Sequence, residues 1–258
     1  MRARAAAMLA LAAVAAGCGD GESATDALSK TAGNMGKIRS GVMAVDVSAK
    51  GRGGGKAANL GFHVDGPFAL ARKGGLPVAK LRYTQVAGSQ RASATFISTG
   101  REAFVEAGGQ ARRLPPAQAR ELRAAAGDLT SDGGVRELRL DRWMRDPKLE
   151  DGISVGGDET DRVTAGVDVH RALADLGGSL GGGAQQLERA VKRARVEVLT
   201  GRKDRLLRRL TLDVDLALDV PKGLRQRLGD LVGGEVRLAF EIRDPNRKVT
   251  VRAPATTG

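Results

Sequence analysis

The stretch 209–220 reads Arg-Leu-Thr-Leu-Asp-Val-Asp-Leu-Ala-Leu-Asp-Val, and it is the clearest structural signal in the chain. From residue 210 to residue 220, aliphatic side chains occupy every second position, with polar or small side chains between them. Successive side chains of a β-strand point to opposite faces of a sheet, so this alternation predicts a strand with one apolar and one solvated face. Such strands form antiparallel sheets whose apolar face must be covered by helices, a second sheet or a ligand.

The same period of two recurs on both sides of this stretch. Residues 193–198 and 235–242 alternate in the C-terminal third, and 155–169 is extended. In the N-terminal half, glycine-rich turns separate five further strands, which is typical of an antiparallel meander. These five strands are expected at 43–48, 60–64, 76–86, 91–98 and 102–106. We expect a turn at 51–55, the end of the second strand at Gly66-Pro67, and the end of the sheet at 249–251.

Helical periodicity predicts the remaining elements. A first helix is expected over 27–38 with Asp26 as its N-cap, because an aspartate carboxylate accepts hydrogen bonds from the first free N–H groups. A second helix begins at Pro115-Pro116, since proline is tolerated in a first turn, and ends at Gly127. The other helices are expected at 138–145, ending before Pro147, and at 170–176, 184–192 and 221–232. The glycine run 177–183 is interpreted as a flexible joint between two of them.

The long strands and few helices together predict an α+β fold. We expect a curved antiparallel β-sheet, a half-barrel, with helices packed on its concave face. If the apolar face of this sheet encloses a cavity, its lining is drawn from the inward positions of the alternating strands. These candidate lining residues are Leu60, Phe62, Val64, Val196, Val198, Leu210, Leu212, Val214, Leu216, Leu218, Val236, Leu238, Phe240 and Ile242.

The first eighteen residues form an export signal. A basic start is followed by the apolar run 5–16 and by Gly17-Cys18. This run is shorter than the roughly 20 residues that a membrane-spanning helix needs, so we interpret it as a signal peptide. Its junction resembles the lipobox of bacterial lipoproteins, with Ala15 where that family prefers leucine. The resemblance implies removal of residues 1–17 and acylation of Cys18, for example with palmitate. The alternative is an ordinary secretory signal with an incidental cysteine.

We therefore divide the chain into three parts: the signal peptide 1–17, the acylated cysteine with a flexible tether 18–25, and one domain 26–258.

The net charge of +12 favours anionic surfaces such as phospholipid headgroups or acidic cell-wall polymers, with simple solvation as the alternative. The export signal argues against nucleic acid as a partner. So does the aromatic content of 3%, since proteins that bind single strands stack bases on aromatic rings.

The sequence contains no group of residues that is a candidate for a catalytic site. The two histidines are His63, at a solvated position of a strand, and His170, at the start of a helix. No cysteine and histidine cluster has zinc-ligand spacing, and no nucleophile-elbow motif is present. Asp158-Glu159 and Asp161 are interpreted as residues that cap a turn, with cation binding as the alternative. We predict no enzyme activity, no catalytic residue, no metal site and no cofactor.

The mature chain resembles the actinobacterial LppX/LprAFG lipoproteins, which share the half-barrel fold of the LolA and LolB carriers. The resemblance rests on a few segments: 155–160 (Val-Gly-Gly-Asp-Glu-Thr) with 163–168, the arginine pair in 207–212, and the ending 242–246 with 249–251. It implies an apolar cavity between the sheet and its helices, in which family members hold the acyl chains of lipids or glycolipids.

Two functions follow as hypotheses. The first is an envelope lipoprotein that binds a lipid or glycolipid and carries it across the envelope, as a monomer, with a membrane transporter as a candidate partner. The second is a membrane-anchored structural or interaction module with a filled core, which binds a cell-wall polymer or a protein and has no lipid ligand. Both place the protein outside the cytoplasm, held at the cell membrane by N-terminal acyl chains.

Overall fold

The computed structural model describes residues 22–53, 56–71, 75–130, 140–180, 188–216 and 233–255. Its strands join in one antiparallel sheet of eleven strands, in the order β6-β5-β4-β3-β2-β1-β11-β10-β9-β8-β7. The first six strands are β1 (Ser40–Gly53), β2 (Lys56–Ala69), β3 (Val78–Ala87), β4 (Gln90–Thr99), β5 (Ala103–Ala107) and β6 (Gln110–Arg113). The other five are β7 (Met144–Asp151), β8 (Thr160–Val167), β9 (Val191–Gly201), β10 (Leu207–Leu216) and β11 (Gly234–Arg243).

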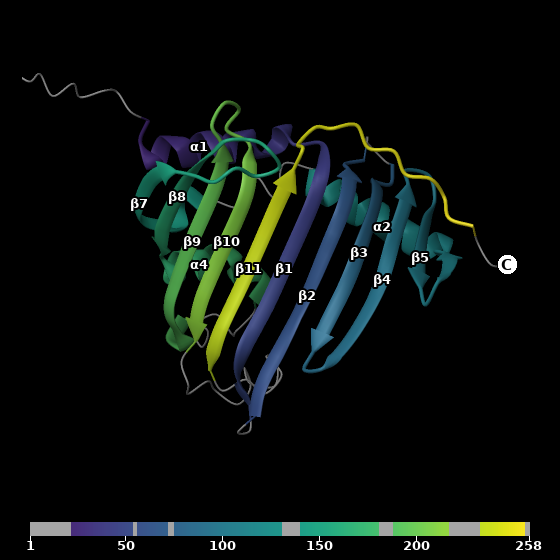
Figure 1. Cartoon of the computed structure of the whole chain (residues 1–258), viewed down its shortest axis with the longest axis horizontal. Coiled ribbons are helices and arrows are strands. Elements are labelled where there is room, and N and C mark those ends of the chain that lie inside the picture. Colours follow the sequence, from purple (N-terminus) through teal and green to yellow (C-terminus); the bar gives the residue numbers. More distant parts are fainter. Residues whose placement is uncertain are drawn as a thin grey trace, which may run out of the picture.

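The sheet consists of two meanders that meet in the middle. Strands β1 to β6 follow one another outward to one edge, and strands β7 to β11 follow one another inward from the other edge. The seam between the meanders is the antiparallel pair β1–β11, which Figure 1 shows at the centre of the sheet. The first strand in the sequence thus pairs with the last one.

The register of the strands separates an apolar from a polar face. Side chains directly opposite each other in an antiparallel pair lie on the same face. One such row runs across β8, β9, β10, β11, β1 and β2, and all of its members are apolar. The row consists of Val163, Val198, Leu210, Phe240, Val45 and Val64. The alternation predicted from the sequence is therefore confirmed in these strands.

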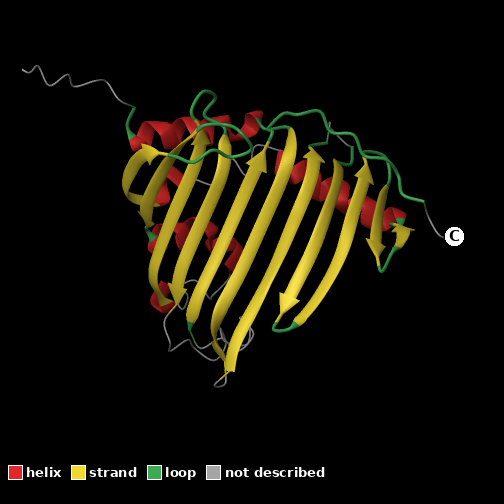
Figure 2. Cartoon of the chain, viewed as in Figure 1, coloured by secondary structure: helices red, strands yellow, loops and turns green. Residues whose placement is uncertain are grey.

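The helices lie on one side of the sheet, which is the arrangement expected (Figure 2). They are α1 (Ala24–Asn34), the 3₁₀ turn η1 (Met35–Lys37), α2 (Pro116–Thr130), α3 (Leu140–Trp143) and α4 (Val169–Leu180). The core between α1 and the sheet includes Ala27 and Leu28 of the helix with Val163, Val198 and Leu207 of the strands. The fold class predicted from the sequence, a curved antiparallel sheet with helices packed on it, is correct.

The helices α1 and α2 differ from their predicted bounds. Ser23, rather than Asp26, is the N-cap of α1, and its side chain accepts a hydrogen bond from the Asp26 backbone N–H. The helix ends at Asn34 instead of residue 38, because the chain tightens into η1 before it enters the sheet. The second helix continues through Gly127 to Thr130, so this glycine does not end it.

Gly66-Pro67 does not end a strand, since β2 continues to Ala69. Gly66 has a φ of +144°, and a Cβ atom at this position would collide with the carbonyl oxygen of Lys80 on the neighbouring strand. The glycine thus allows two backbones to approach closely inside the sheet, and it is not a turn signal here.

A helix over 138–145 that ends before Pro147 was expected, and this prediction is wrong for residues 144–145, while 138–139 lie outside the described residues. The helix α3 ends at Trp143, and the strand β7 begins at Met144 and includes Pro147. This strand lies at the edge of the sheet, and its register with β8 shifts between Arg145 and Lys148. An edge strand with a bulge tolerates proline, because no ladder hydrogen bond needs the missing N–H group.

The remaining predictions have mixed outcomes. The short strand β6 was not predicted, and residues 249–251 form no strand. The helix α4 continues through Gly177-Gly178, where a joint was expected, and β9 begins at Val191, before the predicted end of the helix 184–192. The turn predicted over 51–55 begins later, because β1 continues to Gly53, and residues 54–55 lie outside the described residues. The segments 217–220, predicted as the end of the long strand, and 221–232, predicted as a helix, also lie outside them. Residues 181–187 of the joint and the next helix also lie outside them.

Candidate functional site

A cavity of about 280 Å³ lies between α1 and the apolar face of the sheet. The helix contributes its inner side, and strands β1, β9, β10 and β11 contribute the opposite wall. Nine of the ten lining residues are apolar and the tenth is a threonine. They are Leu28, Thr31, Ala32, Met35, Val45, Val198, Leu207, Leu210, Leu238 and Phe240.

Helix α1 lies over the cavity because one of its sides carries small or apolar residues at helical spacing. Leu28, Thr31 and Ala32 of α1 and Met35, the first residue of η1, stand at positions i, i+3, i+4 and i+7, which share one side of a helix. Each of them lines the cavity. Sequence reasoning assigned the lining to strands alone. The helical spacing indicates that α1 has a small or apolar side, but it does not identify the strands that this side covers.

The threonine in the lining makes its hydrogen bonds within the protein. The hydroxyl of Thr31 lies 2.7 Å from the Ala27 carbonyl oxygen, one turn earlier in the helix, and 2.7 Å from the hydroxyl of Thr200 on β9. A hydroxyl has one donor hydrogen and two acceptor lone pairs, so these partners satisfy it. The cavity therefore presents hydrocarbon, and a ligand with apolar surface enters it without leaving a polar protein group unpaired.

Four of the candidate lining residues border this cavity: Val198, Leu210, Leu238 and Phe240. Val45, Leu207 and the four helix residues were not among the candidates. Three candidates, Val196, Leu216 and Ile242, are buried and do not border it, and Leu218 lies outside the described residues. The other candidates lie in β2, β10 and β11 at positions in register with the apolar rows, and they do not border the cavity: Leu60, Phe62, Val64, Leu212, Val214 and Val236.

The apolar face continues past the cavity toward β2 and β3, where it is less covered. Tyr83 lies opposite Val64 in the register, and its ring stacks on that of Phe62 with the centroids 6.2 Å apart. These two aromatic side chains are 39% and 37% exposed although they belong to the apolar face. The face is thus closed beside α1 and partly open on the β2–β3 side.

One end of β8, β9 and β10 is held by arginine–carboxylate pairs. Arg208, which is almost fully buried, pairs with Asp158 and Asp204 at 2.8 Å each. This contact joins two of the segments on which the family resemblance rests, the glycine-rich 155–160 and the arginine pair in 207–212. Asp158 was interpreted as a turn residue, and its partner Arg208 holds the turn against β10.

Asp161 is the centre of a second group of ion pairs. Arg205 and Arg202 both donate hydrogen bonds to it, the latter at 2.8 Å. Burial favours the neutral form of this carboxyl group, but the two hydrogen bonds outweigh burial, so the pKa of Asp161 is lowered. Burial likewise opposes the ionisation of Asp204, and the hydrogen bonds from Arg208 and the Leu206 backbone N–H lower its pKa.

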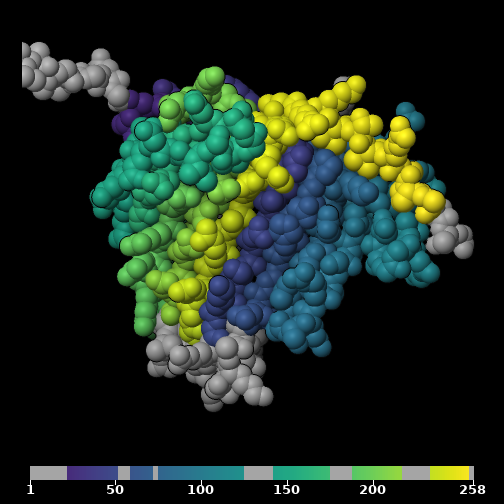
Figure 3. All heavy atoms as spheres, in the orientation of Figure 1, coloured from purple at the N-terminus to yellow at the C-terminus, as the bar shows by residue number. Residues whose placement is uncertain are grey.

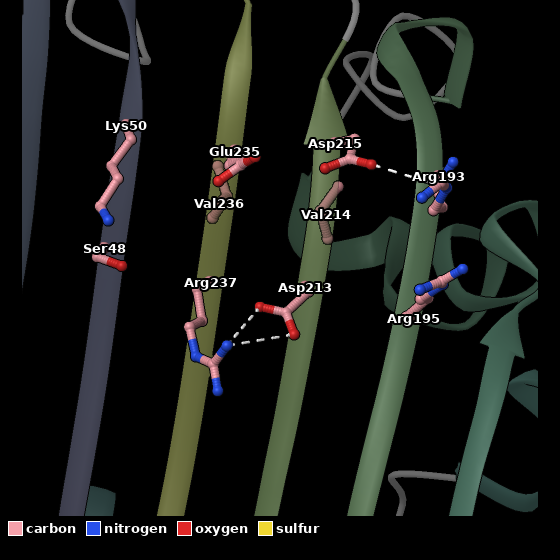
Figure 4. Close-up of a pocket in the computed structure, with 10 residues that line it drawn as sticks. All are labelled: Ser48, Lys50, Arg193, Arg195, Asp213, Val214, Asp215, Glu235, Val236 and Arg237. Atoms are coloured by element: carbon pink, nitrogen blue, oxygen red, sulfur yellow. Dashed lines mark hydrogen bonds and ion pairs between the residues drawn. The ribbon is translucent and has the colours of Figure 1, made fainter.

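The face opposite the helices is polar, and it faces the viewer in Figure 3. It carries a shallow depression of about 340 Å³ across β1, β11, β10 and β9 (Figure 4). Arg237 pairs with Asp213 at 3.2 Å and Arg193 with Asp215 at 3.8 Å, as the cross-strand pairing of charges predicts. The other residues that border it are Ser48, Lys50, Arg195, Val214, Glu235 and Val236.

The two histidines contact carboxylates at the surface. His63 lies between Asp46 and Asp65, at 2.6 and 3.2 Å, and His170 lies 3.2 Å from Glu188. Neither histidine borders the cavity beside α1. In the described part of the chain, no group of three or more His, Cys, Asp or Glu residues is placed to hold a metal ion.

The geometry defines the class of fold as α+β, with an open antiparallel sheet and helices over its apolar face. No protein-family model and no curated protein sequence matches the chain. Among solved structures it is similar to LprF from Mycobacterium bovis, with a TM-score of 0.52 and 13% identity over 90% of this chain and 97% of that chain. LppX from Mycobacterium tuberculosis aligns with a TM-score of 0.41 and 11% identity, over 89% and 98% of the two chains.

The likeness to LprF confirms the fold that the sequence resemblance implied, that of the LppX/LprAFG lipoproteins. It extends over nearly the whole of both chains, so the two meanders and their helices are included. Within the described ranges, no helix is long and apolar enough to cross a membrane.

Proposed function

We propose that this protein is an envelope lipoprotein that holds an acyl chain of a lipid or glycolipid in the cavity beneath α1 and carries it across the envelope. The observation that supports this most directly is the chemistry of the lining: nine apolar side chains and one threonine whose hydroxyl already has protein partners. A hydrocarbon chain is the ligand that such a lining accepts without leaving polar groups unpaired.

The volume of the cavity beneath α1 limits the size of the ligand that we propose. Ligand pockets usually measure about 300–1,000 Å³, and this cavity measures about 280 Å³. It is suited to part of one acyl chain and not to several chains side by side. The exposed pair Phe62 and Tyr83 continues the apolar surface, and a longer chain would extend along it.

The proposed location follows from the N-terminus. Removal of residues 1–17 and acylation of Cys18 would hold the mature chain at the outer surface of the cell membrane. The mature chain would act as a monomer with one domain, 26–258. Two or more acyl chains give stable anchoring, whereas a single chain binds reversibly. A membrane transporter that delivers or receives the lipid is the partner this role requires.

Extraction of bound lipid tests the proposal. The mature chain with Cys18→Ser, which lacks the anchor's own acyl chains, is purified without detergent, extracted with organic solvent and analysed by mass spectrometry. A lipid with fatty-acyl chains in roughly stoichiometric amount is expected. Extracts that contain no lipid, from protein that is folded by circular dichroism, would overturn the carrier function.

The depression on the polar face favours the second function, an interaction module for a cell-wall polymer or a protein. It presents both signs of charge on four adjacent strands. Charge reversal separates the two functions, because Lys50→Glu with Arg195→Glu changes this face without touching the cavity. Loss of a cell-wall or protein partner in this variant, from a protein that carries no lipid, would favour the interaction module.

A further inference from the structure

The first described residue is fixed to the sheet by ion pairs. Glu22 pairs with Arg205, in the loop between β9 and β10, and with Lys30 of α1 at 2.7 Å. Cys18 precedes Glu22 by four residues. Because an extended chain spans at most about 3.6 Å per residue, a connection of four residues reaches at most about 14 Å. An acyl anchor on Cys18 would therefore hold this end of the sheet close to the membrane.

Three loops of the same end are tied together by hydrogen bonds. Asn34, at the end of α1, donates to the carbonyl oxygen of Asp204 at 3.1 Å. The backbone N–H of Arg39 donates to the Asn246 side chain at 2.8 Å, and the Ser40 hydroxyl donates to the Arg247 carbonyl oxygen at 2.6 Å. Figure 1 shows α1, the β9–β10 loop and the chain after β11 along this one end of the sheet.

These loops carry exposed cations, which we call the basic rim: Lys37, Arg39, Lys203, Arg247 and Lys248. Of these, Arg247 pairs with Asp244 at 3.1 Å. Asp204, the other carboxylate in these three loops, pairs with the buried Arg208. Among the described residues, the other four rim cations have no ion-pair partner. The neighbouring loop 152–159 carries two exposed carboxylates, Asp158 and Glu159. Asp158 shares Arg208 with Asp204, so the carboxylates of this region offset two of the rim charges.

We propose that the basic rim is a docking surface for anionic phospholipid headgroups. The inference rests on the Cys18 anchor of the proposed function and adds a second point of attachment. The helix α1 separates the two points: its eleven residues span about 16 Å at 1.5 Å per residue. A molecule held at both points stands with its strands directed away from the bilayer, and the rim faces the headgroups.

The energetics favour a lipid surface as the partner. Each lysine or arginine near an anionic membrane contributes roughly fivefold to the binding constant, and the attraction decays within about 8 Å at physiological salt. Lys203 follows the ion-paired Arg202 and precedes the ion-paired Asp204, so its loop keeps it at this end of the sheet. The acyl anchor would keep the molecule at the membrane surface, and these charges come within this range when the rim faces the headgroups.

Vesicle binding of the mature chain with Cys18→Ser tests the rim without the acyl anchor. The vesicles consist of phosphatidylcholine alone or of phosphatidylcholine with phosphatidylglycerol, and bound protein is measured by co-sedimentation. Tighter binding to the phosphatidylglycerol vesicles, lost in high salt, is expected. Lys37→Ser with Lys248→Ser should weaken this binding by about 25-fold, at roughly fivefold per cation.

The matched control is Lys50→Ser with Lys192→Ser. These two exposed lysines have no ion-pair partner among the described residues, and they lie at the other end of β1 and β9. The control changes the net charge equally and should leave binding unchanged. An equal loss in both variants, or no preference for phosphatidylglycerol in the parent, would overturn the proposal. Lipid extracted from the same preparations reports on the cavity separately, so failure of the carrier function is recognised independently.

Discussion

The hydroxyl of Thr31 on α1 and the hydroxyl of Thr200 on β9 lie 2.7 Å apart and are buried, although 169 residues separate them in the sequence. This hydrogen bond holds the helix to the sheet beside the cavity. It also removes from the lining a polar group that would otherwise need a ligand or water.

We expect Thr200→Val to destabilise the fold by about 1–2 kcal/mol, because it removes a buried hydrogen bond and leaves one partner less satisfied. Urea unfolding measures the change. The control is Thr84→Val, which removes an exposed hydroxyl pair with Ser93 at 3.1 Å and should have almost no effect. Equal effects of the two substitutions would show that the contact between α1 and β9 does not stabilise the protein.

Leu210→Trp places a large ring at the wall of the cavity. If the cavity holds an acyl chain, bound lipid should fall severalfold while the free energy of unfolding changes little, since the ring occupies space that the ligand vacates. If the region is instead a close-packed core, overpacking costs about 1–3 kcal/mol. Mass spectrometry of extracts and circular dichroism measure the two quantities. Leu81→Trp, on β3 away from the cavity, is the control and should retain the lipid.

Acid should weaken the fold through Asp161. Its pKa is lowered in the folded protein, so its ion pairs contribute stability above the ordinary carboxyl value of 3.8, and this contribution is lost as the pH falls below that value. Asp161→Asn should therefore cost about 2 kcal/mol at neutral pH, and the difference from the parent should shrink in acid. Asp213→Asn is the control, because its pair with Arg237 is exposed and contributes about 0.5 kcal/mol. A pH-independent difference for Asp161→Asn would contradict the assignment.

Lipid retention should be nearly constant between about pH 5 and 8, the range in which histidine commonly titrates. His63 and His170 both lie outside the cavity lining. Lipid content is measured by mass spectrometry after incubation across this range. A large loss near pH 6 that His63→Gln abolishes would show that the polar face communicates with the cavity.

Cys18→Ser should abolish acylation and prevent processing after Gly17. Metabolic labelling with a fatty-acid analogue should mark the parent chain and leave the variant unmarked. Labelling of neither chain, with both exported, would favour the ordinary secretory signal. Ser23→Ala provides the control, since it alters the cap of α1 and keeps the cysteine.

Sequence reasoning predicted the strands well where one face is apolar and the other solvated. In 210–216 and 235–242 every inward residue is aliphatic or aromatic, so the period of two stands out. The prediction from sequence was wrong where the conformation of a residue depends on a neighbouring strand. Gly66 is required by the backbone of Lys80, fourteen residues later, and Pro147 is tolerated because its strand has only one neighbour. Both facts concern the sheet and not the local sequence.

The candidate site was predicted in part for the same reason. The strands supply Leu210, Leu238 and Phe240, which the alternation identified. The opposite wall comes from α1, and nothing in an isolated helical pattern states which strands it covers. The short strand β6 has four residues, Gln-Ala-Arg-Arg, too few for alternation to be recognised.

The seam between β1 and β11 has a consequence for the order in which the protein folds. The β1 segment is synthesised early, but its partner on one side, β11, follows about 190 residues later. Contacts this distant in the sequence form slowly, and an unpaired strand edge is prone to aggregation until they form. A chain truncated before Gly234 should leave β1 unpaired on one side, which increased protease sensitivity would report.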